Sequence, residues 1–365
     1  MASETVVRVE LAHSPYTIGI LAGGLDQLPR RLAAHSPTKV FVLYDENVKP
    51  HLAILESAFA TELVEFEVFE IPSGEGSKCI ELATSIWQFL AEKRADRKSM
   101  IVALGGGVVG DLAGFVAASY ARGIPFFQVP TTLLSHVDSS VGGKTGINLP
   151  NAKNMVGAFW QPAEVLIDIQ TLSTLEDREY VSGLAEVIKY GLIMDQPFFE
   201  KLEANVDKIA QRDDEFLIEM IAHCCRLKSQ VVIEDEKETS GRRAILNYGH
   251  TFAHAFEAQF GYGEYLHGEA VAVGMLCAGR LAEKLGMVDE SFCSRQHALI
   301  EAVGLPTQVA RCEATPLIEV MQRDKKNVDD IIRFILPDRI GNVTLISQPI
   351  DRQLIVDSMQ EYMAE

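Results

Sequence analysis

Long apolar runs are missing from this 365-residue chain. The longest mostly apolar stretches, 112–121 and 270–279, fall short of the roughly 18 residues that a helix needs to span a bilayer. The N-terminal segment carries Glu4 and Glu10, where a signal peptide would have positive charge followed by an apolar core. These absences predict a cytoplasmic protein with no membrane partner.

Cysteines and basic residues are scarce as well. The six cysteines form no CxxC pair, which indicates reduced thiols and argues against a disulfide framework or a cysteine zinc site. Lys and Arg number 33 against 51 Asp and Glu, and the resulting net charge of −18 repels nucleic acid. We therefore expect a small molecule as partner, and no nucleic acid.

The remaining pattern predicts two domains, which is also the expectation for this length. The first half alternates β-rich runs with helical stretches such as 77–94, where Ser77 is a candidate N-cap, and such alternation is typical of a parallel sheet with helices on both faces. Predicted strands span 5–9, 16–20, 40–44, 64–71, 100–104 and 126–129. From about 180 to 302 helical periodicity dominates, and 331–336 with 342–346 predicts a late hairpin. We predict an α/β domain over 1–178 and a mostly α-helical domain over 179–365.

A glycine-rich string connects a predicted strand to a predicted helix. Residues 105–110 read GxGxxG, in which glycine lets backbone N–H groups approach a pyrophosphate at a helix N-terminus. The alternative is a tight turn that needs small residues only for packing. We favour a dinucleotide phosphate site, with Asp45 as a candidate ribose partner and with 73–78 and 131–132 as further donors.

Three histidines and a carboxylate suggest a metal site. His250 and His254 share one face of a predicted helix, and His267 follows in a separate turn. With Glu186, two of these histidines would supply the ligand types of a catalytic zinc site that keeps positions open for substrate oxygens. Helical histidine pairs also occur as simple packing, and the spacing does not decide which two histidines bind.

Several bases lie in glycine- or amide-rich strings rather than on charged helix faces. Together they would form a locally positive pocket for a small anionic substrate, with phosphate and carboxylate held by Lys, Arg and Asn. They are Arg122, Lys144, Lys153 beside Asn154, Lys189, Lys228, Arg243 and Lys325.

Five strings of the chain are specific enough to compare with known families. They read GGGVVGDLAGFVAASYARGI, PTTLLSHVDSSVGGKTGINLPNAKNMVGAFWQP, GLAEVIKYG, LNYGHTFAHAFE and LHGEAVAVGM. Together they resemble the 3-dehydroquinate synthases of the sugar phosphate cyclase group. The resemblance implies a Rossmann-like NAD-binding α/β domain, a helical domain with the metal, an active site in the cleft between them, and a homodimer.

Carried over by motif, the resemblance assigns each group of residues a role. It implies zinc, or alternatively cobalt, on Glu186, His250 and His267, and leaves His254 to contact substrate. Around the substrate it places Arg122, Asp138, Lys144, Lys153, Asn154, Lys189, Lys228, Arg243, Asn247, His254 and Lys325. Around NAD it places Asp45, Asn47, Glu75, Lys78, Gly106, Gly107, Val108, Asp111, Thr131, Thr132, Lys144, Lys153 and the stretch from Thr171 to Thr174.

The implied reaction converts 3-deoxy-D-arabino-heptulosonate 7-phosphate (DAHP) into 3-dehydroquinate and phosphate. The implied steps are transient oxidation by NAD, phosphate elimination, re-reduction, ring opening and aldol closure. Three alternatives stay open: a sister cyclase acting on sedoheptulose 7-phosphate or glucose 6-phosphate, an NAD-dependent metal alcohol dehydrogenase, and a catalytically silent NAD-binding regulator. The sister substrates lack the carboxylate, so a pocket without carboxylate-binding residues would be expected for them. Lys228, Arg243, Asn247 and His254 are all present, which favours DAHP.

Overall fold

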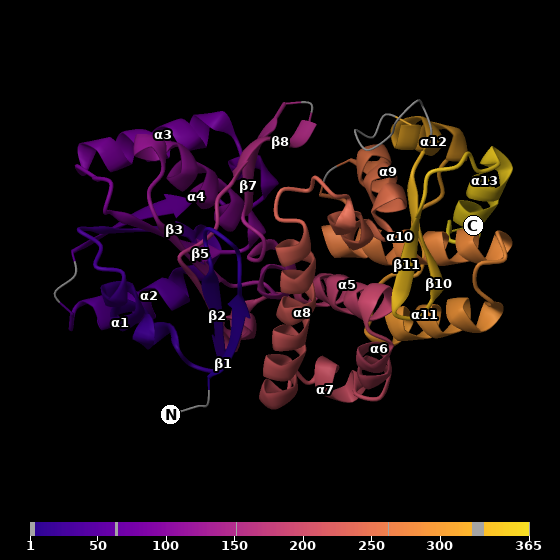
Figure 1. Ribbon diagram of the computed structural model, residues 1–365, viewed down its shortest axis with the longest axis horizontal. Coiled ribbons are helices and arrows are strands. Elements are labelled where there is room, and N and C mark those ends of the chain that lie inside the picture. Colours follow the sequence, from indigo (N-terminus) through magenta and orange to yellow (C-terminus); the bar gives the residue numbers. More distant parts are fainter. Residues whose placement is uncertain (1–3, 63–64, 151, 262, 323–331, 365) are drawn as a thin grey trace. The chain divides into compact units, whose positions relative to one another are not determined.

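The chain folds into two compact units (Figure 1). The computed structural model describes residues 4–62, 65–150, 152–261, 263–322 and 332–364. The first unit comprises Met1–Glu176 and Leu217–Lys237, and the second Asp177–Phe216 and Glu238–Glu365. Helix α8 (Asp214–Glu234) therefore begins in the second unit and continues into the first.

The first unit is built on a seven-stranded sheet. Its order is β1 (Thr5–Val9), β2 (Tyr16–Leu21), β9 (Glu164–Asp168), β6 (Phe126–Pro130), β5 (Met100–Gly105), β3 (Val40–Asp45) and β4 (Phe66–Ile71). All neighbours from β2 to β4 pair in parallel, and only the edge strand β1 is antiparallel. Every residue of β5 is buried, as expected of a strand covered on both faces. The predicted fold class of this unit is confirmed.

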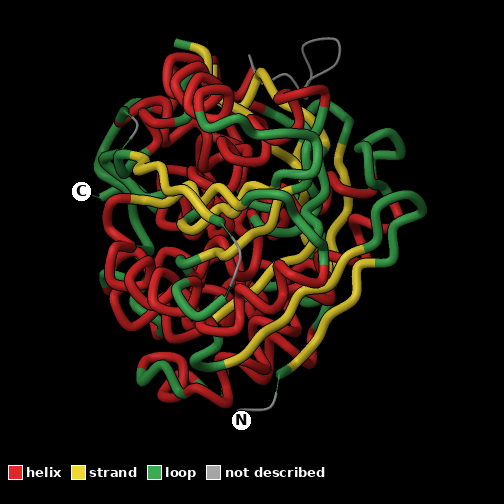
Figure 2. The backbone as a smooth tube through the Cα atoms, turned by 90° about the vertical axis from the view of Figure 1, so that its left-hand side faces the viewer, coloured by secondary structure: helices red, strands yellow, loops and turns green. Residues whose placement is uncertain are grey.

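Helices cover both faces of this sheet because its strands bury side chains in alternating directions. Val40 and Val42 pack in one core with α1 (Leu28–Ala34) and α2 (Lys49–Phe59). Phe41 and Leu43 pack in the other with α3 (Ile80–Glu92) and α4 (Gly107–Ser119), and Figure 1 shows the two helix pairs on opposite sides of the strands. Figure 2 distinguishes strands from helices along the backbone.

Sequence patterning found six strands of this sheet but missed β9, and it placed one helix start wrongly. Helix α3 begins at Ile80 after Cys79, whereas Ser77 donates its hydroxyl to the Pro72 carbonyl and caps no helix. A separate antiparallel hairpin, β7 (Lys144–Leu149) with β8 (Ala152–Phe159), was also not predicted. Its glycines and polar residues hide the period of two, and a Cβ at Gly157 would lie 2.2 Å from the Thr145 carbonyl oxygen.

The second unit is mostly helical, as predicted. Its helices are α5 (Asp177–Met194), α6 (Gln196–Glu203), α7 (Val206–Ala210), α9 (His250–Phe260), α10 (His267–Lys284), α11 (Glu290–Ala302), α12 (Ala314–Gln322) and α13 (Arg352–Gln360). The expected hairpin is present as β10 (Phe334–Arg339) and β11 (Asn342–Ile346), and its predicted start at Ile331 lies outside the described residues. Helix α10 is buried almost throughout and lies at the core of this unit. Among the described helices, none has the length and hydropathy of a membrane span.

Candidate functional site

Apart from Lys144 and Lys153 of the β7–β8 hairpin, the residues expected to bind NAD follow the carboxyl ends of five neighbouring parallel strands. Parallel strands end at the same edge of their sheet, and in open α/β sheets this edge is where ligands bind. Along this edge lie Glu75 and Lys78 after β4, Asp45 and Asn47 at β3, Gly106, Gly107, Val108 and Asp111 after β5, Thr131 and Thr132 after β6, and Thr171 with Thr174 after β9. The topology therefore brings together residues that the sequence scatters over 130 positions, from 45 to 174.

The glycine turn leaves no room for side chains where it meets the next loop. A Cβ at Gly106 would lie 3.0 Å from Thr132 Cγ2, and one at Gly107 would lie 3.0 Å from Ser139 Oγ. Gly107 begins α4, whose first N–H groups have no partner within the helix and favour an anion. Burial raises the pKa of Asp45, whose carboxylate accepts the Asn47 N–H at 2.9 Å. The turn is thus both tightly packed and suited to a phosphate.

Lys78 lies at the centre of a polar network at this edge. Its side chain is only 5% exposed, and its Nζ donates to Asp111 Oδ2 at 2.7 Å and to Asn154 Oδ1 at 2.6 Å. Burial raises the pKa of Asp111, and the Lys78 ammonium opposes that rise. This network connects two residues expected near NAD, Lys78 and Asp111, with Asn154, which is expected near the substrate.

Asp138 lies in a short π-helix, Ser135–Ser139, a form that often marks functional sites. Lys228 of α8 donates to the Asp138 backbone carbonyl at 2.6 Å and pairs with Asp138 Oδ1 at 2.8 Å. Two expected substrate contacts from distant parts of the sequence are therefore paired within the first unit.

The other expected substrate contacts of this unit lie on strained or exposed backbone. Arg122 and Asn154 adopt φ of +68° and +53°, in the left-handed region that non-glycine residues seldom occupy. Both residues are exposed, as is Lys144 at the start of β7, while Lys153 is partly buried in β8. Such strain persists where surrounding structure imposes it, and it is common at ligand sites.

The three residues expected to bind metal are gathered in the second unit. One ligand atom from each of Glu186, His250 and His267 lies within 4.8 Å of the others. The Glu186 side chain is 1% exposed, and His250 Nε2 lies 3.7 Å from its Oε1. Among the described residues neither Glu186 oxygen accepts a hydrogen bond, although Lys189 of the same helix forms an ion pair with it. A buried carboxylate beside two imidazoles fits a zinc-type ion.

Two further acceptors, neither of them predicted from the sequence, orient the imidazoles. His267 Nδ1 donates to Glu257 Oε1 at 3.2 Å, and His250 Nδ1 donates to the Tyr248 carbonyl at 3.1 Å. Hydrogen bonds of this kind fix the tautomer so that the other ring nitrogen faces a metal. Burial lowers the pKa of His267, but the carboxylates of Glu257 and Glu186 outweigh it, so the net shift is upward. Glu257 lies seven residues after His250 and therefore on the same face of α9. This spacing is the one feature of the sequence that could have identified Glu257 as a partner of the histidines.

Close helix packing holds the histidines at these positions. A Cβ at Gly268, the residue after His267, would lie 1.8 Å from the Ser182 carbonyl of α5. Gly249, immediately before His250, has φ of +80°, and a Cβ there would lie 2.7 Å from Met275 of α10. Both candidate ligands therefore begin their helices beside glycines that no other residue would replace without strain.

The remaining expected substrate contacts of the second unit are His254, Lys189, Arg243, Asn247 and Lys325. The His254 ring centroid is 5.5 Å from that of His250, and Lys189 is buried beside Glu186. Arg243 is buried in a short 3-10 helix, Arg242–Asn247, where Asn247 donates its amide to the Ala244 carbonyl at 3.2 Å. Lys325 lies outside the described residues.

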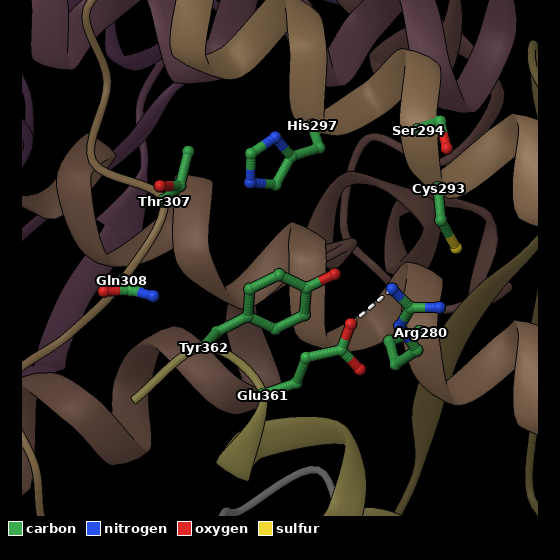
Figure 3. A pocket seen from close by; sticks show the side chains of 8 residues that line it. All are labelled: Arg280, Cys293, Ser294, His297, Thr307, Gln308, Glu361 and Tyr362. Atoms are coloured by element: carbon green, nitrogen blue, oxygen red, sulfur yellow. Dashed lines mark hydrogen bonds and ion pairs between the residues drawn. The ribbon is translucent and has the colours of Figure 1, made fainter. Parts of the chain in front are cut away.

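A separate pocket of about 360 Å³ lies in the second unit (Figure 3). Tyr362 lies between His297 and the Arg280–Glu361 ion pair in this view. The lining residues are Arg280, Cys293, Ser294, His297, Thr307, Gln308, Glu361 and Tyr362. None belongs to the metal cluster or to the expected substrate contacts, so this pocket is not the candidate site.

Two solved structures resemble nearly the whole chain. One is 2-deoxy-scyllo-inosose synthase complexed with carbaglucose-6-phosphate, NAD+ and Co2+, with a TM-score of 0.88, 25% identity and coverage of 98% of this chain and 100% of that one. The other is 2-epi-5-epi-valiolone synthase from Streptomyces hygroscopicus with NAD+ and Zn2+ bound, with a TM-score of 0.88, 25% identity and coverage of 97% and 98%. A probable glycerol dehydrogenase from Sinorhizobium meliloti, 16% identical with a TM-score of 0.64, shares the fold alone.

Sequence comparisons are more specific. Residues 68–182 match the family model of the 3-dehydroquinate synthase N-terminal region, and 183–327 match that of the C-terminal region. The 3-dehydroquinate synthase of Rhodopirellula baltica is 47% identical over 357 residues, which cover 96% of this chain and 95% of the relative. That of Pelobacter propionicus is 46% identical over 365 residues, which cover 98% and 99%. The chain therefore belongs to the 3-dehydroquinate synthase family.

Proposed function

We propose that the chain converts DAHP into 3-dehydroquinate and phosphate, as an NAD- and metal-dependent carbon–oxygen lyase of the shikimate pathway. The gathering of Glu186, His250 and His267 within 4.8 Å of one another carries this proposal. Supporting it, five parallel strands end at the edge where the expected NAD contacts lie. The same proposal includes that the protein is cytoplasmic and forms a homodimer.

Both cofactors match residues present in the chain. Glu186, His250 and His267 would hold the metal, zinc in preference to cobalt, while the glycine turn and the residues along the strand ends would hold NAD. When bound, the metal supplies a Lewis acid for the substrate hydroxyls, and NAD supplies reversible hydride transfer, so that no cofactor is consumed.

The residues of the chain itself bind and orient the substrate. Arg122, Lys153, Asn154 and His254 hold the phosphate by charge-assisted hydrogen bonds, and Lys228 with Arg243 holds the carboxylate. Asp138, paired with Lys228, and Asn247 complete the set of residues around the substrate, and Lys144 and Lys189 add positive charge around the anionic substrate. After the transient oxidation, the leaving phosphate accepts the proton from C6 of the substrate. Phosphate elimination therefore requires no separate protein base. Lys325 would be a further substrate contact.

Phosphate release from DAHP by the purified protein with NAD, followed together with absorbance at 340 nm, tests this function. Release without lasting NADH, abolished by a chelator, is the expected result. Steady accumulation of NADH would instead identify a dehydrogenase. Turnover of sedoheptulose 7-phosphate but not of DAHP would assign the chain to a sister cyclase.

A histidine pair of variants tests the metal ligands directly. His250→Ala should lose both the bound metal and phosphate release, because one of three ligands is removed. His297→Ala, on α11 and outside the proposed site, should keep both. Metal analysis of the two proteins decides the matter, and full metal content in His250→Ala would contradict the assignment.

A further inference from the structure

We propose that Asn148 is a positioning residue that couples the cofactor side of the site to its phosphate side. This inference rests on the proposed function, because it takes Glu75 and Lys78 as NAD contacts and Asn154 as a phosphate contact. Asn148 itself touches none of the reacting groups in this scheme. It acts through the residues to which it is bonded.

The backbone at Asn148 departs from the hairpin that contains it. The register of β7 against β8 shifts between Ile147 and Leu149, so Asn148 lies at a bulge. Its N–H donates instead to the Lys78 carbonyl at 2.7 Å, which anchors the hairpin to the loop after β4. Bulges of this kind redirect side chains and are frequent beside active sites.

The Asn148 side chain uses both ends of its amide. Its Nδ2 donates to Glu75 Oε1 at 2.8 Å, and its Oδ1 accepts the Asn154 backbone N–H at 2.8 Å. One residue thus contacts both an expected NAD contact and the backbone of an expected phosphate contact. An Asn can serve both partners because its amide offers a donor and an acceptor at a fixed separation.

Lys78 connects the same partners from the other direction. Its Nζ lies 3.6 Å from Glu75 Oε1 and donates to Asn154 Oδ1 at 2.6 Å. Since Lys78 holds Oδ1, the Nδ2 group of Asn154, which donates to no acceptor among the described residues, is the end available to a phosphate oxygen. Asn148 and Lys78 together hold Asn154 in its left-handed conformation at φ +53° and set which end of its amide faces outward.

A double-mutant cycle tests this inference. Asn148→Ala should lower kcat/KM for DAHP by about 10- to 100-fold, chiefly through a higher KM, because two hydrogen bonds to the site are lost. Combined with Asn154→Ala, it should add less than about threefold, because Asn148 acts through Asn154. Full multiplication of the two single effects, or an Asn148→Ala loss within twofold, would overturn the proposal.

Two further measurements separate positioning from misfolding and from a wrong function. Hydrogen exchange of the Asn154 amide should be faster in Asn148→Ala, whereas Asn148→Asp, which keeps the acceptor but faces Glu75 with a carboxylate, should retain protection and lose NAD affinity. Asn342→Ala, which removes a similar bond to Asp338 in the β10–β11 hairpin, should leave DAHP kinetics unchanged. If the wild-type protein did not act on DAHP, the proposed function would fail, and unchanged Asn154 exchange would still refute the positioning role.

Discussion

His136 is a buried histidine whose imidazole resists protonation in the folded protein. Its Nε2 donates to the Pro130 carbonyl at 2.9 Å, and burial lowers its pKa from 6.5 to about 4, although Asp168 nearby opposes the shift. Above pH 6.5 the ring is neutral in both the folded and unfolded chain and costs nothing. As the pH falls toward 4, only the unfolded chain takes up the proton, so the free energy of unfolding should decrease by about 3 kcal/mol.

His136→Gln isolates this contribution, because the Gln amide can still donate to Pro130 but does not titrate. Urea unfolding at pH 7 and at pH 4.5 should show a smaller acid loss in the variant than in the wild-type protein. An equal acid loss in both would show that His136 becomes protonated without unfolding and that the assigned burial cost is wrong.

At the scale of single residues, the sequence indicated which side chains were candidates for the site but not how they are arranged. Their spacing on one helix face identified His250 and His254 as candidate ligands. Only the tertiary structure shows that His267 and Glu186 lie beside His250. Glu257 and Asn148 escaped notice because their roles depend on partners that are not evident from local pattern. Acidic and amide residues are common on any surface, so a helical spacing of seven was too weak a signal for Glu257.

At the scale of elements, the start of α10 depends on its contact with α5. Gly268 allows this approach, because any Cβ there would overlap the Ser182 carbonyl, and its N–H donates to Ser182 Oγ at 3.1 Å. Gly268→Ala should push the helices apart, lower the free energy of unfolding by roughly 3 kcal/mol and weaken metal binding by moving His267. Thermal unfolding and metal titration measure both effects.

Gly110→Ala provides the matched control in a helix of the first unit. A Cβ there would find its nearest neighbour, Gln128 Oε1, at 3.5 Å, which is an ordinary contact. Its stability should be unchanged or slightly higher, because Ala favours a helix over Gly. If Gly268→Ala proved as stable as Gly110→Ala, close helix approach would not be what places His267.

The burial of an element's side chains determined whether that element could be predicted from the sequence. Strands such as β3 and β5 are buried along their length, so apolar β-branched runs identified them. The β7–β8 hairpin escaped because β8 is partly exposed and because Gly146 and Gly157 serve close strand approach rather than a core. The hairpin carries Lys144, Lys153 and Asn154, so the least predictable element holds several of the expected substrate contacts.

At the scale of the whole molecule, the residues proposed to hold the two cofactors belong to different units. The expected NAD contacts belong to the first unit and the candidate metal ligands to the second. The chain crosses between the units after residues 176, 216 and 237, and α8 belongs to both. Loss of either unit would therefore remove part of a continuous helix from the other.

This shared helix predicts a single cooperative unfolding transition. A ligand present at 100 times its Kd stabilises the folded state by about 2.7 kcal/mol, so NAD and zinc should each raise the one Tm by a few degrees. Calorimetry of the metal-free protein with each ligand alone and with both measures this. Two resolved transitions, one moved only by NAD and the other only by zinc, would show that the units unfold independently and that α8 does not couple them.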